Sequence, residues 1–149
     1  MEAPGALLIL FLFILFPLLN LVALGLKYSC SYYLHQVQLR EAALLPASLA
    51  NSAAGAVKRG LPQQWKNSGL GSFVDMVQEL PETAIRYEKG EVAANGVHER
   101  VVVLSSRFQL RPFLSVATPG LPELPGLNQP FTYSFESKRL LENPANAEL

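Results

Sequence analysis

The sequence predicts an α+β fold: a long N-terminal transmembrane helix continuing into a juxtamembrane helix, then short helices, then a small antiparallel sheet of about three or four strands. Two observations carry this prediction. Residues 6–26 contain no charged side chain, and the period of the apolar residues changes near residue 82 from helical to alternating. The helices are the only available cover for the sheet, which needs one to bury its apolar face.

These patterns divide the chain into four parts: a transmembrane anchor (1–26), a juxtamembrane helical stretch (27–62), a small α+β domain (63–142) and a flexible tail (143–149). Beyond the anchor about 120 residues remain, enough for one domain. The 149 residues include 12 basic and 12 acidic side chains, giving no net charge and no basic block. This balance argues against a nucleic-acid partner.

The apolar run of residues 6–26 predicts a retained membrane anchor. About 20 apolar residues in a helix span roughly 30 Å, the thickness of the hydrocarbon core. The run is longer than the core of a cleaved signal peptide, and the first four residues lack Lys and Arg. Pro17 is tolerated in such a helix. Asn20 either hydrogen-bonds a neighbouring helix or is simply tolerated.

Residues that follow the run predict a membrane interface, formed by Lys27 with Tyr28, Tyr32 and Tyr33. The positive-inside rule, counting Lys27 and Arg40, would place the following domain in the cytoplasm. Cys30, the single cysteine, forms no intrachain disulfide. Two roles stay open for it: a small residue at the membrane interface, or a site of lipidation.

The middle of the chain predicts helices separated by loops. Residues 27–45 form a helix that Pro46 ends, and residues 47–59 form a second helical stretch rich in small residues. Residues 63–71 are expected to be a loop. Ser72 is the expected N-cap of a short helix that Pro81 stops.

The last third predicts strands at residues 85–88, 97–110 and 131–137. Asn95-Gly96 is a hairpin signal. The apolar run 101–104 indicates a strand covered on both faces, and the length of 97–110 suggests a bulge or a bend midway. A proline-rich loop, 112–130, joins the last two strands.

No catalytic or ligand-binding pattern is present. His35 and His98 lack partners at metal-ligand spacing, and Cys30 with His35 on one helix does not build a pocket. Trp65 is expected to be a packing anchor. Four glutamates are expected to form a solvated face: Glu79, Glu82, Glu88 and Glu91. The sequence therefore predicts a protein that is not an enzyme, with no cofactor, no metal and no small-molecule ligand.

Three segments together resemble the TadE-like family, pilin-like minor components of tight-adherence (Flp-type) pilus systems. The start GALLILFLFILFPLLNLVALGLKY is similar to the family's G-A-x-V-E-F-A-L-x-L-P-L-L-L segment, with Gly5 as the glycine. YYLHQVQLREAALLPASLA is similar to its juxtamembrane helix. The valine-rich strand leads through Phe108, Pro112 and Phe113 to the last strand, TYSFESKRL. The family carries a glutamate where this chain has Leu10, so processing at Gly5 stays open.

The resemblance implies a single-pass protein of the cytoplasmic (inner) membrane with an extracytoplasmic C-terminal domain. Its partners would be the lipid bilayer and other pilin-like or envelope assembly subunits. The expected helix-packing residues, for which lipid contact is the alternative, are Leu8, Phe11, Leu15, Pro17, Leu18, Leu19 and Asn20. The expected partner loop, which could instead cover the sheet, contains Pro112, Phe113, Pro119, Pro122 and Pro125. The alternative function is a membrane-tethered extracytoplasmic binding or regulatory module.

Overall fold

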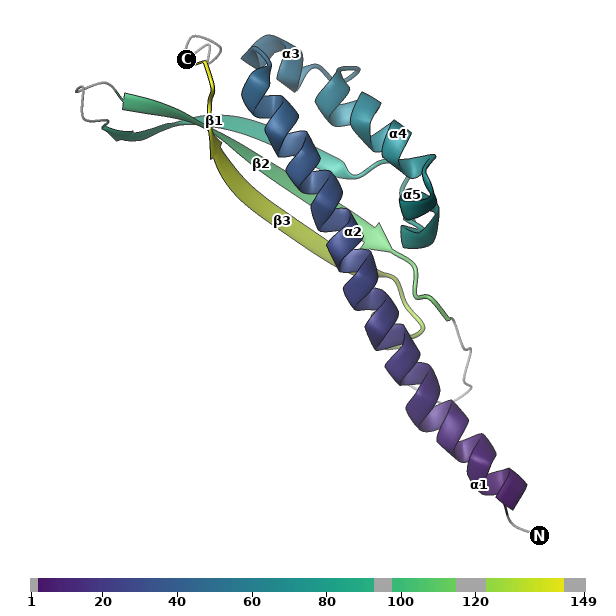
Figure 1. Cartoon of the computed structure of the whole chain (residues 1–149). Coiled ribbons are helices and arrows are strands. Elements are labelled where there is room, and N and C mark those ends of the chain that lie inside the picture. The colour runs from purple at the N-terminus through teal and green to yellow at the C-terminus, as the bar shows by residue number, and fades with distance from the viewer. Residues whose placement is uncertain (1–2, 93–97, 115–122, 144–149) are drawn as a thin grey trace.

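One continuous helix dominates the computed structural model, which describes residues 3–92, 98–114 and 123–143. It consists of α1 (Ala3–Leu10), a π-helical turn η1 (Phe11–Leu15) and α2 (Phe16–Leu44) (Figure 1). The π-helical turn ends next to Pro17, whose missing N–H and ring disturb regular α-helical bonding. The helix ends where predicted, because Leu45 adopts an extended conformation ahead of Pro46.

Four short helical segments follow, and here several predictions are wrong. They are α3 (Ala47–Asn51), η2 (Ala56–Gly60), α4 (Leu61–Lys66) and α5 (Gly69–Val74). The stretch 47–59 is interrupted, and 63–71 is mostly helical rather than a loop. Trp65 is buried in the core, as expected of a packing residue. Burial of this large side chain stabilises the helical conformation of α4.

The N-cap of α5 is Ser68, not Ser72, and its hydroxyl accepts a hydrogen bond from the Gly71 amide. The helix stops at Val74 because Asp75 is left-handed, with φ of 50°. Gly71 lies against the backbone of Trp65, where a Cβ would clash with the carbonyl oxygen. Only glycine fits this junction. The packing of α5 against α4 therefore places the helix start at Ser68, and the Ser72–Asp75 pattern does not form a cap.

A three-stranded antiparallel sheet completes the fold, in the order β1-β2-β3. The strands are β1 (Glu82–Val92), β2 (His98–Leu110) and β3 (Phe131–Leu140). Ile85 pairs with Leu104, which pairs with Ser137. The irregular register lies between Lys89 and Val92 on β1, not within β2. The strands thus confirm the α+β prediction, although the Asn95-Gly96 turn lies outside the described residues.

The helix and the short helices cover one face of the sheet (Figure 1). Val102 and Leu104 of β2 are fully buried in a cluster with Leu39 and Ala43 of α2. A second cluster joins Leu34 of α2 and the short helices α4 and α5 to the other end of the sheet: Leu34, Trp65, Val74, Met76, Phe108, Leu110 and Phe135. The helices are the cover that the sheet was predicted to need.

The opposite face of the sheet is polar. Arg86 bridges Glu88 and Glu136 at 3.0 and 2.9 Å, and Lys138 reaches Glu88 at 2.7 Å. Val103, which is paired with Arg86 and Lys138, is fully buried among these groups. β2 is therefore apolar on both faces, as its sequence predicted, but long charged side chains cover one of them.

Candidate functional site

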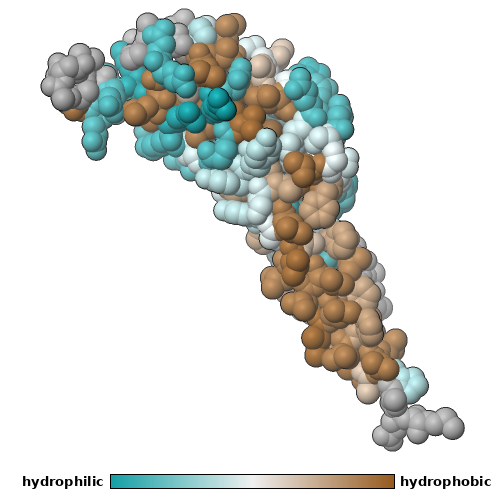
Figure 2. Space-filling view, in the orientation of Figure 1, coloured by the Kyte–Doolittle hydropathy of each residue, from teal (hydrophilic) through white to brown (hydrophobic). Residues whose placement is uncertain are grey.

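The N-terminal part of the long helix projects from the folded body, and its face in Figure 2 is apolar. Its large side chains are exposed at Leu7, Leu8, Ile9, Leu10, Phe11, Leu12, Phe13, Ile14, Leu18, Leu19, Leu21, Val22 and Leu26. The helix Pro4–Leu44 is long and apolar enough to cross a membrane. Exposed apolar surface of this extent is unfavourable in water and is typical of a membrane or assembly surface.

The residues predicted to pack against other helices lie on this projecting part. Leu8, Phe11 and Leu18 are about half exposed or more, and Leu19 is 42% exposed. Leu15 and Pro17 are half-buried. Leu8, Phe11, Leu15 and Leu18 are spaced by three and four residues, so they share one face of the helix.

Where the helix joins the domain, its buried face carries polar side chains among apolar ones. The buried polar side chains of α2 are Asn20, Lys27, Ser31, His35 and Gln38, which we call the polar seam. The residues between them that face outward include Leu21, Leu26 and Tyr33, all more than half exposed. Between Asn20 and Ser31 the helix buries mainly polar side chains and exposes apolar ones, the reverse of a surface helix of a water-soluble domain.

Asn20 makes two hydrogen bonds to the backbone of Leu114, in the loop that follows β2. Its amide nitrogen donates to the Leu114 carbonyl at 2.9 Å, and its amide oxygen accepts from the Leu114 N–H at 2.8 Å. The side chain is 2% exposed. The predicted role of Asn20 as polar contact to another helix is therefore corrected, because its own loop occupies both groups.

Lys27 is also buried against this loop instead of facing outward. Its Nζ donates to the Arg111 carbonyl at 2.9 Å and lies 5.9 Å from the ring centre of Phe73. Arg111 itself forms an ion pair with Asp75 at 2.8 Å. These three charges lie together at the level of Lys27, one residue beyond the apolar run.

The tyrosines of the predicted interface have a different setting. Tyr33 is 58% exposed, whereas Tyr28 and Tyr32 are partly exposed and pack edge-on against Phe135. Tyr133 of β3 donates its hydroxyl to the Leu24 carbonyl at 3.0 Å. Tyr28 and Tyr32, two residues of the predicted membrane interface, therefore also join the helix to the sheet.

Further along α2, His35 and Gln38 lie at the helix–sheet interface. His35 Nδ1 is 3.0 Å from the hydroxyl of Ser106, and Gln38 donates to the Val57 carbonyl at 2.7 Å. His35 lies outside the apolar run 6–26 and is fully buried, and this burial lowers its pKa to about 4. It is therefore neutral at physiological pH.

The pairing of Ser106 and His35 has the residue types of a nucleophile and its base. Ser106 is only 2% exposed and His35 is fully buried under the helix, so a substrate has no access to either. Among the described residues, no group of three or more His, Cys, Asp or Glu side chains could hold a metal. Cys30 packs beside the second core cluster, and the side chain of His98 lies outside the description.

The predicted partner loop can be located in part. Pro112, Phe113 and Pro125 are described, whereas Pro119 and Pro122 lie outside the described residues. The described limbs, 111–114 and 123–130, contact the long helix through Asn20 and Leu24. Whether the loop as a whole covers the sheet or binds a partner stays a prediction. An apolar groove of about 740 Å³ separates the second limb from the helix.

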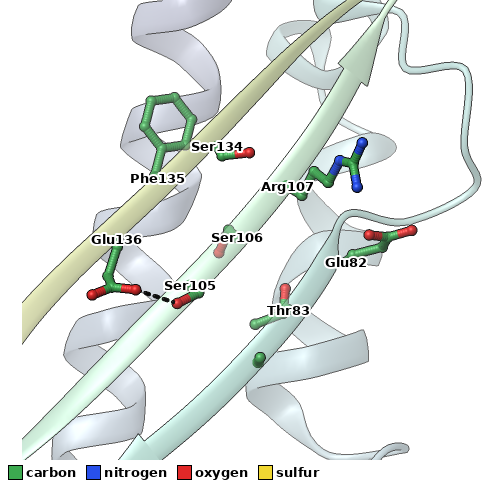
Figure 3. Close-up of a pocket in the computed structure, with 9 residues that line it drawn as sticks. Glu82, Thr83, Ser105, Ser106, Arg107, Ser134, Phe135 and Glu136 are labelled. Atoms are coloured by element: carbon green, nitrogen blue, oxygen red, sulfur yellow. Dashed lines mark hydrogen bonds between the residues drawn. The ribbon is translucent and has the colours of Figure 1, made fainter.

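A second, shallow groove of about 390 Å³ crosses the open side of the sheet (Figure 3). The polar side chains on this open side are those of Glu82, Ser105, Arg107, Ser134 and Glu136. Hydrogen bonds from Ser105 and Arg86 lower the pKa of the Glu136 carboxyl, and bonds from Lys138 and Arg86 lower that of Glu88. These groups neutralise one another and are largely exposed. Of the four glutamates expected on a solvated face, Glu82 and Glu88 lie on this side of the sheet.

Sequence reasoning located Asn20 and Lys27 but missed their partners, Leu114 and the Arg111 carbonyl. Both partners are backbone groups, which carry no sequence signal. It also missed Ser106, although the alternation along β2 places this residue on the helix-facing side. No family model, no curated protein and no solved structure matches this chain.

Proposed function

We propose that this chain is a non-enzymatic, single-pass, TadE-like pilin-like subunit that contributes to the assembly or structure of a pilus or secretion-type envelope complex. Its helix crosses the cytoplasmic membrane, and its α+β domain lies on the extracytoplasmic side. One observation carries the proposal: a single helix is apolar on all sides at its start and becomes the core of a small sheet domain further on.

The polar seam supports this proposal. Because Asn20, Lys27 and Ser31 face the chain's own domain or its loop, the outward faces of the helix are left apolar. A subunit that packs laterally against others in a membrane needs such a surface, because helices in a membrane associate largely through van der Waals packing. The shared face of Leu8, Phe11, Leu15 and Leu18 is the proposed contact between subunits.

Disulfide crosslinking in native membranes tests the proposal. In a Cys30→Ala background, single cysteines at Leu8 and Leu15 are expected to yield crosslinked adducts with another envelope subunit or a second copy. A cysteine at Leu49, 56% exposed on α3 and away from the projecting helix, is the matched control. A protein that remains an uncrosslinked monomer at both helix positions would contradict the assembly role.

The alternative, a membrane-tethered binding or regulatory module, is favoured by the open groove on the sheet. The two functions differ in what the helix must do. The exchange should be limited to residues 4–19, because from Asn20 onward the helix makes hydrogen bonds to its own domain. If an unrelated apolar segment of equal length preserves function, the tethered module is favoured; loss of assembly with an intact fold favours the pilin-like subunit.

A further inference from the structure

The described limbs of the β2–β3 loop run beside the apolar part of the helix. Residues 111–114 leave the end of β2 and run toward the N-terminal end of the long helix (Figure 1). Leu114 lies at the level of Asn20, to which it is hydrogen-bonded. Gly126, on the second limb, packs against Leu24, where a Cβ would come within 2.6 Å of a Leu24 methyl carbon. Both limbs therefore lie at levels within residues 6–26.

The rise of the helix per residue gives the distance between the charged residues near Lys27 and the two contacts of the loop. Lys27, Arg111 and Asp75 form the charged level, and Asn20 is seven residues nearer the N-terminus, about 10 Å along the axis. If the loop stayed outside the bilayer, only residues 4–19 could cross it. These 16 residues span about 24 Å, less than the roughly 30 Å of a hydrocarbon core.

The tips of both limbs, residues 113–114 and 124–127, carry only apolar side chains and Gly126. Phe113 is 52% exposed and Leu124 is 45% exposed. The groove between the second limb and the helix is lined by apolar side chains and Gly126, with Asn20 as the exception among its lining residues. Glu123 is exposed beside Leu124. Because a carboxylate is costly in hydrocarbon, this residue limits the limbs to the edge of the bilayer.

Several backbone groups of the limbs have hydrogen-bond partners within the chain. Asn20 pairs with both backbone groups of Leu114. The Leu124 N–H donates to Asn128 Oδ1 at 2.7 Å, and its carbonyl accepts from the amides of Leu127 and Asn128. Pro112 and Pro125 have no N–H to satisfy. Internal pairing of this kind is what irregular backbone requires at membrane depth.

We propose that the tips of the two limbs of the β2–β3 loop, residues 113–114 and 124–127, are embedded in the bilayer leaflet on the side of the domain. There they lie against the helix within about 10 Å of the hydrocarbon edge, and lipid acyl chains fill the apolar groove. The proposal rests on the proposed crossing of the membrane by the helix. It assigns the exposed apolar side chains of the loop to lipid and not to a protein partner.

Spin labels at single cysteines test this placement. The full chain, in a Cys30→Ala background, is reconstituted into vesicles of phosphatidylethanolamine and phosphatidylglycerol. Labels are placed at Phe113 and Leu124, with Phe13 on the bare helix as the membrane control and exposed Ser134 on the sheet as the aqueous control. The measurement compares relaxation by oxygen, which concentrates in lipid, with relaxation by a water-soluble nickel complex.

Labels at Phe113 and Leu124 are expected to favour oxygen over the nickel complex, as Phe13 does, whereas Ser134 favours the nickel complex. If Phe13 favours oxygen but Phe113 and Leu124 behave like Ser134, the loop lies in water and the inference is overturned, while the membrane anchor stands. If Phe13 also behaves like Ser134, the proposed anchor fails and the inference fails with it.

Discussion

The two halves of one helix differ in what surrounds them. Residues 4–19 are apolar on every side and carry no part of the folded domain's core, whereas residues 20–44 bury a polar seam, then Leu39, Ala42 and Ala43, against the sheet. The first half fits lipid or a neighbouring helix, and the second is a structural element of the domain. A segment apolar enough to cross a membrane and a scaffold of the domain are thus parts of one continuous helix.

The largest expected effect comes from truncating matched leucines in the two halves. Leu34→Ala, at a side chain 2% exposed, should lower the free energy of unfolding by about 2–5 kcal/mol, because it leaves a cavity in the second core cluster. Leu8→Ala, at 62% exposed, should change it by less than about 0.5 kcal/mol. Denaturant unfolding of the full chain in detergent measures both. Equal losses would mean that the bare half is also packed within the subunit.

The next largest effect is pH dependence at the polar seam. His35 has its pKa lowered from 6.5 to about 4 in the folded protein, so the unfolded chain binds the proton first as the pH falls. Its contribution is fully present above about pH 6.5 and is lost down to about pH 4, a change of at most about 3 kcal/mol. Unfolding curves from about pH 7 to about pH 4 measure it.

The control for this prediction is His35→Gln, which keeps a hydrogen-bonding group opposite Ser106. Acidic side chains such as Glu88 and Glu136 also titrate as the pH falls, and both proteins share them. The difference between the two stability profiles therefore isolates the histidine. A variant that loses stability as steeply as the natural chain between pH 6.5 and about 4 would remove His35 as the cause.

A smaller effect is expected where the two halves meet. Asn20→Ala leaves the Leu114 N–H and carbonyl without their partner, which costs about 1–3 kcal/mol locally and releases the loop from the helix. Hydrogen exchange at the Leu114 amide should quicken by about one to two orders of magnitude. Leu19→Ala, next along the helix but facing outward, is the control and should leave this amide protected.

The difference between the halves also separates what the sequence predicts from what it does not. The apolar run, the stop at Pro46 and the alternating strands are local patterns, and each placed an element correctly. The Ser72 cap failed because the approach of Gly71 to Trp65 is a tertiary constraint. Asn20 was recognised as unusual, but its partner lies 94 residues away on a backbone, so no local pattern could identify it.

The smallest expected effect contrasts two glycines on either side of the loop–helix contact. Gly126 has a φ of 84° and lies against Leu24, so Gly126→Ala should destabilise the contact by about 1–2 kcal/mol through backbone strain and the displaced leucine. Gly25 is helical with nothing within 4 Å of a built Cβ. Gly25→Ala should therefore be neutral or stabilise the helix by up to about 1 kcal/mol.

Two measurements separate these glycine effects. The amide of residue 126 donates to the Gln129 carbonyl at 2.8 Å, so its protection from hydrogen exchange, compared between the natural chain and the Gly126→Ala variant, measures the first effect. Thermal unfolding measures the second. If Gly126→Ala, like Gly25→Ala, leaves the loop protected and the protein as stable, the contact with Leu24 does not hold the loop. The boundary between the two halves of the helix would then lie on the N-terminal side of Leu24, at Asn20 or before it.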